Sequence, residues 1–207
     1  MQIGIIGAGT IAQALAAHAI RAGHSVVLSN SRGPETLTSV VSALNEAAAS
    51  SGTASAGTVV EAAQAPVVLL AVPWTKVDAA LTGLPDWDGR ILIDTTNHFL
   101  RIPPNPIIDD LGGRVNSEVV AEKAPGARVV KAFNAMTGRY VAADPVHAEG
   151  RQVVFYSGDD SEAKTVFADL VSGFGFAPID VGTLHDGGRL MQLGGPLIMQ
   201  HLLKLDD

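Results

Sequence analysis

The sequence alternates short runs of β-branched residues with longer stretches rich in alanine and leucine, and this alternation constrains the fold most. Residues Gln2–Ile6 are typical of a buried strand, and residues 67–72 form an unbroken apolar run that predicts another. Residues 10–22 are typical of a helix that ends at Gly23. Strand, helix and strand in succession predict parallel pairing through right-handed crossovers. We therefore expect an α/β fold with a doubly wound, mostly parallel sheet of about eight strands.

The rest of the chain continues this pattern and predicts one domain over residues 1–207. Residues 100–106 are rich in proline and predict a loop, and residues 184–207 predict a short helical C-terminal extension with a break at Gly194, Gly195 and Pro196. The further strands are expected at 25–29, 54–56, 91–94, 128–132, 153–157 and 177–181. The further helices are expected at 35–49, 59–64, 76–81, 118–123 and 161–173.

Composition excludes several classes of protein. The chain has no cysteine, which excludes disulfides and thiolate metal sites, and its net charge of −7 argues against nonspecific nucleic-acid binding. Apolar runs stay far below the roughly 20 residues that a membrane helix needs, and the first residues lack the pattern of a signal peptide. The six histidines form no metal-binding pattern. We expect a cytoplasmic protein that holds no metal and partners neither membranes nor nucleic acids.

A glycine-rich loop, Gly7-Ala8-Gly9-Thr10-Ile11-Ala12, joins the first strand to the first helix. In this context it fits a dinucleotide-binding fingerprint, with Gly7 for the tight turn and Gly9 for close approach of a pyrophosphate. The small Ala12 lets helix and strand pack closely. The helix N-terminus then offers free N–H groups to the anion. The loop predicts a Rossmann fold that binds a dinucleotide.

The end of the second strand indicates which dinucleotide. NAD-binding folds usually place a carboxylate there for the ribose 2′-hydroxyl, but this strand ends in Ser29-Asn30-Ser31-Arg32. Hydroxyl and amide groups can donate to a phosphate, and Arg32 can pair with it. We therefore expect NADP(H); the alternative is a polar turn with a solvated arginine.

Polar and aromatic residues follow three other strands, at the edge where such sheets bind ligands. Trp74, after Val72 and Pro73, either walls the nicotinamide pocket or packs under a helix. Asn97 is a candidate partner of a carboxamide or ribose, and Asp94 is expected to hold the turn before it. Lys131 and Asn134 end an apolar strand, which favours a place in the site.

These motifs together resemble one family. The chain resembles the deazaflavin (coenzyme F420)-dependent NADP reductases and the related reductase domain of six-transmembrane metalloreductases. The segments that carry the resemblance are the glycine loop, Ser31-Arg32, Val72-Pro73-Trp74, residues 129–134, residues 157–160, residues 175–184 and Arg189-Leu190. The resemblance runs through nearly the whole chain. Asn134 departs from it, since the deazaflavin enzymes tend to carry histidine there, and the flavin-using metalloreductase domains resemble this chain more closely at that point.

The resemblance implies an NADP-dependent oxidoreductase that transfers a hydride between NADPH and a second bound ring cofactor, either F420 or a flavin (FMN or FAD). Such transfer depends on positioning, so no catalytic residue is assigned. The alternatives are a small imine or carbonyl reductase and a noncatalytic NADP(H)-binding sensor. The apolar C-terminal residues favour a homodimer. The candidate cofactor-binding residues are Gly7, Gly9, Thr10, Ile11, Ala12, Asn30, Ser31, Arg32, Val72, Pro73, Trp74, Asn97, Ala132, Phe133 and Asn134.

Overall fold

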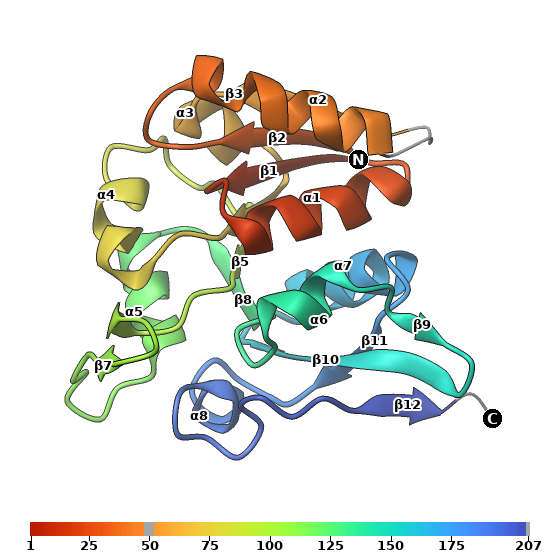
Figure 1. Cartoon of the computed structure of the whole chain (residues 1–207). Helices are drawn as coiled ribbons and strands as arrows, with labels where there is room; N and C mark the ends of the chain where they lie inside the picture. The colour runs from red at the N-terminus through yellow and green to blue at the C-terminus, as the bar shows by residue number, and fades with distance from the viewer. Residues whose placement is uncertain (48–51, 206–207) are drawn as a thin grey trace.

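The computed structural model describes residues 1–47 and 52–205 as alternating strands and helices (Figure 1). The strands are β1 (Gln2–Ile6), β2 (Ser25–Ser29), β3 (Thr53–Gly57), β4 (Val67–Leu70), β5 (Ile91–Asp94), β6 (Phe99–Arg101), β7 (Ile107–Ile108), β8 (Arg128–Ala132), β9 (Val146–His147), β10 (Gly150–Gly158), β11 (Ala177–Asp180) and β12 (Leu203–Leu205). The α-helices are α1 (Thr10–Arg21), α2 (Thr38–Ala47), α3 (Val59–Ala63), α4 (Val77–Leu81), α5 (Asn116–Lys123), α6 (Gly138–Ala142), α7 (Ser161–Gly173) and α8 (Asp186–Met191). Two 3₁₀ helices, η1 (Pro34–Leu37) and η2 (Trp74–Lys76), precede α2 and α4.

The main sheet confirms the expected doubly wound architecture. Its continuous path runs β11-β10-β8-β5-β4-β1-β2-β3, and β9 and β12 also pair with β10. Each pair along the path is parallel except β10 with β8. The eight strands of the path match the predicted number.

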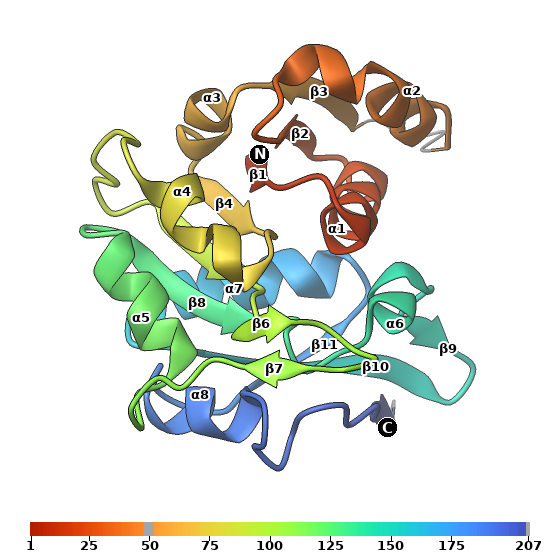
Figure 2. The ribbon, with the colours of Figure 1, turned by 60° about the vertical axis from the view of Figure 1, so that its left-hand side comes forward.

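Two apolar layers sandwich the sheet, because its strands are buried on both faces. Residues of α1, α2 and α7 pack against one face, around side chains such as Leu15 and Phe167. Residues of α3, α4 and α5 pack against the other face, around Leu70 and Leu92. Figure 2 shows α4 and α5 on the side of the sheet opposite α1 and α7.

The strand order reverses between β1 and β4, since β2 and β3 extend the sheet to one side and β4, β5 and β8 to the other. In open α/β sheets ligands bind outside the carboxyl ends of the strands at such a reversal. The glycine loop leaves the carboxyl end of β1, so the topology places it at this position.

The C-terminal extension is only partly helical, and the prediction of a helix over most of 184–205 was wrong. Gly194 has φ 85°, a left-handed conformation that ends helices, and Pro196 follows it. The chain instead runs from α8 through turns to β12, which pairs antiparallel with β10. Residues 206 and 207 of the predicted extension lie outside the described residues.

The segment after β5 also differs from its prediction as a plain loop. Strands β6 and β7 form a small antiparallel hairpin around the proline-rich turn, with the side chains of Ile107 and Ile108 exposed. Strands of two or three residues are too short to give a periodic signal, so the sequence did not reveal them. The helix predicted at 35–49 begins as η1 and continues as α2, and its last two residues lie outside the described ranges.

A buried histidine of α1 makes stability depend on pH. His18 is 2% exposed; its Nε2 lies 2.7 Å from the Val141 carbonyl oxygen, and Arg21 donates to its Nδ1 at 2.6 Å. Burial lowers the pKa of His18 below its ordinary 6.5, and the positive charge of Arg21 adds to this, against the Val141 hydrogen bond and Asp144. Above pH 6.5 the imidazole is neutral in both the folded and the unfolded chain, so its protonation does not change the free energy of unfolding. Below it the unfolded chain takes up a proton that the folded chain resists, so stability falls as the pH falls.

We expect His18→Gln to flatten this pH dependence. Between about pH 7.5 and about pH 5.5, the free energy of unfolding of the parent should fall by about 1 kcal/mol more than that of the variant. Urea titrations at the two pH values measure the difference. His147→Gln, at an exposed histidine in β9, is the control and should follow the parent. Equal pH dependence in His18→Gln and the parent would contradict the assignment to His18.

Candidate dinucleotide and hydride-transfer site

The glycine loop has the geometry of a phosphate-binding turn. Gly7 has φ 120°, and a Cβ built on it would lie 2.1 Å from the Ala71 carbonyl oxygen, so the fold itself requires glycine there. A Cβ built on Gly9 would meet no atom of the described chain within 4 Å, so packing does not require glycine at this position. A ligand that approaches the Gly9 backbone would explain it.

The first helix begins directly at this loop. Gly9 is its N-cap and supplies no side-chain cap, and the first turn carries no acidic residue, so the first backbone N–H groups suit an anion. Ala12 is fully buried against the sheet, where a larger side chain would push α1 away. Thr10 is exposed and Ile11 half-buried at the start of the helix, close to where a bound phosphate would lie.

The turn after β2 presents cationic and hydroxyl groups beside the loop. Asn30 holds this turn, because its Oδ1 accepts from the Arg32 backbone N–H at 2.8 Å and its Nδ2 donates to Thr36 Oγ1 at 2.9 Å. The side chains of Ser31 and Arg32 are exposed. Asn30 therefore shapes the turn, while Ser31 and Arg32 remain accessible to a ligand.

A cavity of about 530 Å³ lies over the glycine loop. It brings together many of the predicted residues and adds Lys76, which the sequence reasoning missed. Of the described residues that line it, two are cationic (Arg32 and Lys76) and none is acidic. The lining residues are Ile6, Gly7, Ala8, Gly9, Asn30, Ser31, Arg32, Val59, Ala71, Val72, Pro73, Lys76, Ala79 and Ala80. Its charge and apolar walls suit a phosphorylated nucleotide.

Trp74 lines a different cavity from the one over the glycine loop. Its indole N–H donates to Asp109 Oδ2 at 2.7 Å, and its ring meets His98 edge-on, with centroids 6.4 Å apart. The cavity beside it, about 410 Å³, lies near α4 and α5. Val72 and Pro73 line the dinucleotide cavity as expected, whereas Trp74 is tied to the segment that follows β7.

Asn97 and Asn134 meet at the carboxyl ends of β5 and β8, and we call them the amide pair. Asn97 Nδ2 donates to the Asn134 carbonyl oxygen at 2.8 Å, and Asn134 Nδ2 lies 3.3 Å from Asn97 Oδ1. Strands β5 and β8 lie two and three positions from β1, or about 10 and 14 Å at the ~4.8 Å strand spacing. The amide pair therefore lies on the opposite side of the glycine loop from Arg32.

The two residues before Asn134 contribute differently. Ala132 and Phe133 are buried in the core of the sheet, so their side chains do not line the cavity. Phe133 has φ 63°, a rare conformation for a bulky residue, and it turns the chain sharply at the end of β8.

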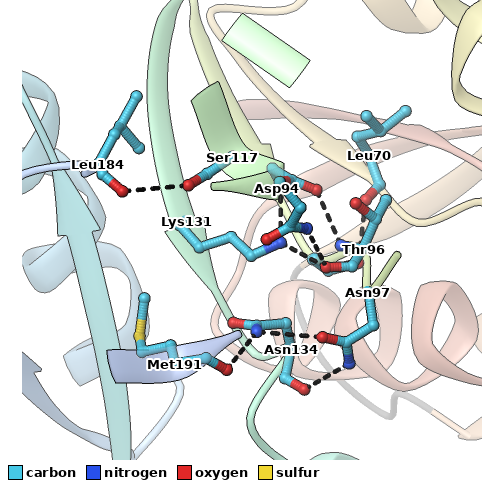
Figure 3. Close-up of polar contacts among 11 residues, drawn as sticks. Leu70, Asp94, Thr96, Asn97, Ser117, Lys131, Asn134, Leu184 and Met191 are labelled. Carbon is cyan, nitrogen blue, oxygen red and sulfur yellow. Dashed lines mark hydrogen bonds and ion pairs between the residues drawn. The ribbon is translucent and has the colours of Figure 1, made fainter. Parts of the chain in front are cut away.

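Lys131 does not reach the surface of the site, contrary to the sequence interpretation. Its side chain is fully buried, and its Nζ forms an ion pair with Asp94 Oδ2 at 2.8 Å (Figure 3). Burial lowers the pKa of Lys131, and Asp94 opposes that effect. Asp94 also accepts the Thr96 backbone N–H at 2.8 Å, which confirms its expected role in the turn.

The described part of the chain shows neither a metal site nor a membrane-spanning helix. In residues 1–47 and 52–205 no group of three or more histidine, aspartate or glutamate side chains could hold a metal ion. Among the helices of the same ranges, none is long and apolar enough to cross a bilayer.

Comparisons with known proteins agree with this geometry. Residues 2–98 match the family model described as NADP oxidoreductase, coenzyme F420-dependent. The chain is 29% identical over 184 residues to the metalloreductase STEAP3 of Rattus norvegicus, covering 88% of this chain but only 34% of that longer protein. It thus spans about a third of the length of that relative.

Two solved structures share the fold over most of their length. A hypothetical protein, SMa0349, from Sinorhizobium meliloti is 41% identical with a TM-score of 0.89, over 99% of this chain and 96% of that one. A putative F420-dependent NADP reductase from Arthrobacter sp. FB24 is 24% identical with a TM-score of 0.74, over 89% and 86% of the two chains.

The doubly wound sheet, the glycine loop and the cationic end of the cavity define a Rossmann-type dinucleotide-binding protein, and its relatives indicate an NADP-dependent oxidoreductase. The comparisons narrow this class, since the family match covers the strands and helices that build the cavity. Residues 2–98, just under half of the chain, match the F420-dependent NADP oxidoreductase family, and the chain is also similar to the metalloreductase STEAP3.

Proposed function

We propose that this protein transfers a hydride between NADPH and a second bound ring cofactor, either the deazaflavin F420 or a flavin. The observation that carries the proposal is the cavity over Gly7 and Gly9, with Arg32 and Lys76 among its lining residues and the amide pair three strands or fewer away. NADP(H), when bound, supplies or accepts the hydride. The chain itself has to hold and orient the two rings.

Each part of the site has a separate task in this proposal. The Gly9 backbone and the N-terminus of α1 would hold the pyrophosphate, and Ser31, Arg32 and Lys76 would hold the 2′-phosphate. The apolar side chains of Val59, Ala79 and Ala80 would flank the adenine. These contacts would fix the phosphate-bearing end of the dinucleotide, and the nicotinamide would then lie on the side of β5 and β8.

The proposal is tested by titrating the purified protein with NADPH and NADH and then adding F420, FMN or FAD. We expect tighter binding of NADPH, and loss of absorbance at the nicotinamide band with one of the three acceptors. Oxidation of NADPH by a small cyclic imine or carbonyl compound, but by none of the ring cofactors, would instead support an imine or carbonyl reductase. Tight NADPH binding without oxidation by any of them would support a sensor.

We also propose that the protein acts as a homodimer. The side chains of Met199, Leu202, Leu203 and Leu205, in β12 and just before it, are exposed, and a second copy would cover them. Sedimentation velocity tests this, and a monomer at micromolar concentration would contradict it. The cytoplasmic location expected from the sequence stays a prediction.

A further inference from the structure

Lys131 is chemically out of place in its strand. Its neighbours Val129, Val130 and Ala132 are apolar and buried, whereas Lys131 carries an ammonium group to a fully buried position beside Asp94. Removing two charges from water is costly, and apolar residues of similar volume often stabilise a fold as well or better. Stability alone therefore does not account for this ion pair.

The buried ion pair holds the backbone of Thr96 from both sides. Asp94 Oδ1 accepts the Thr96 N–H, and Lys131 Nζ donates to the Thr96 carbonyl oxygen as well as to Asp94 Oδ2. Asn116 Nδ2, from the start of α5, donates to the same carbonyl at 3.1 Å. Because both polar backbone groups of Thr96 are fixed, the position of the next residue, Asn97, is fixed too.

A second costly feature converges on the same place from β8. The positive φ of Phe133 directs Asn134 toward Asn97, and Asn134 Nδ2 also donates to the Met191 carbonyl oxygen at 2.8 Å. Figure 3 shows the contacts of the ion pair around Thr96 and, next to them, those of the amide pair with Met191; the two sets meet where Asn97 follows Thr96 in the chain. Strained or costly groups persist where the surrounding structure holds them for a functional geometry.

We propose that Lys131 and Asp94 are positioning residues, which hold the amide pair ready to bind the carboxamide of nicotinamide. Asn97 is only half-buried, so part of its amide is accessible to a ligand. Asn134 Oδ1 is buried and accepts no hydrogen bond within the described residues, which leaves the pair an acceptor to spare. A primary carboxamide offers both a donor and an acceptor, which complement those of an asparagine side chain.

This inference rests on the proposed function only in that NADPH binds, and its test needs no hydride acceptor. Calorimetry measures the dissociation constants of NADPH and of 2′,5′-ADP, which lacks the nicotinamide. A separate measurement records the fluorescence of bound NADPH. The test variant is Asp94→Asn with Lys131→Met, which removes both charges and keeps an acceptor for the Thr96 N–H. The control is Lys164→Met with Asp180→Asn, an ion pair of 2.9 Å between α7 and β11.

We expect the test variant to bind NADPH about tenfold more weakly, as loss of one to two hydrogen bonds predicts, and 2′,5′-ADP within about twofold of the parent. The fluorescence of bound NADPH should move toward that of free NADPH, and the control should match the parent in every readout. Unchanged NADPH affinity and fluorescence would overturn the proposal, because the ion pair would then not position the amide pair. Equal losses of affinity for NADPH and 2′,5′-ADP would also overturn it, because they would indicate a general effect on the fold.

Asn97→Ala keeps the proposal testable if the double variant does not fold, because Asn97 is half-exposed and its loss is easier to tolerate. It should show the same separation between NADPH and 2′,5′-ADP, and full NADPH affinity in this variant would overturn the proposal. If the parent binds NADPH but no acceptor oxidises it, the proposed hydride transfer fails while these binding results still decide the role of the ion pair.

Discussion

Replacing Gly9 with valine is expected to weaken NADPH binding about a hundredfold while the protein still folds. The side chain would enter space that no described residue occupies, and it would keep the pyrophosphate from the backbone N–H groups of the loop. Losing two charge-assisted hydrogen bonds costs about 3 kcal/mol, which corresponds to that loss of affinity. The φ of −79° at Gly9 suits valine, so the free energy of unfolding should fall by no more than about 1 kcal/mol. Calorimetric titration and urea denaturation measure the two quantities.

Gly7→Ala is the matched comparison and should behave in the opposite way. Its Cβ would meet the Ala71 carbonyl oxygen at a φ that disfavours any side chain, so the free energy of unfolding should fall by about 2 kcal/mol or more. The two glycines therefore separate ligand binding from folding. Full NADPH affinity in Gly9→Val would contradict the placement of the pyrophosphate at this loop.

The sequence predicted the sheet well because its central strands are buried on both faces. A strand such as β4 must be a continuous apolar run, and the glycines that end α1 and open the loop are required by backbone conformation. Such features are local, so they can be predicted from residue order. The hairpin of β6 and β7 and the strand β12 are too short for a periodic pattern and depend on tertiary pairing.

The candidate site was predicted less completely because side-chain direction depends on tertiary contacts. The side chain of Lys131 points into the interior, where it forms an ion pair with Asp94 on the neighbouring strand. The two residues become neighbours only because β8 pairs with β5, which residue order does not show. Trp74 turns to Asp109, which lies 35 residues further along the chain. Lys76 enters the cavity because η2 follows Pro73. The one available signal was a cation three residues after that proline.

Arg32→Ala is expected to reduce NADPH affinity by about thirtyfold and NADH affinity by less than about twofold. Arg32 lines the cavity with an exposed guanidinium, and a bond from such a group to a phosphate is worth about 2 kcal/mol. NADH lacks the 2′-phosphate, so its binding does not use that bond. Lys76→Met should shift the preference in the same direction, since its ammonium lines the same cavity.

The control for this prediction is Arg90→Ala. Arg90 precedes β5 at the amino-terminal edge of the sheet, opposite the cavity, and packs its guanidinium over Trp87. The Arg90→Ala substitution removes the same charge from the protein as Arg32→Ala, so it reports any effect of net charge on the binding of a polyanion. Its ratio of NADPH to NADH affinity should equal that of the parent. Equal losses for NADPH and NADH in Arg32→Ala would show that the 2′-phosphate is recognised elsewhere.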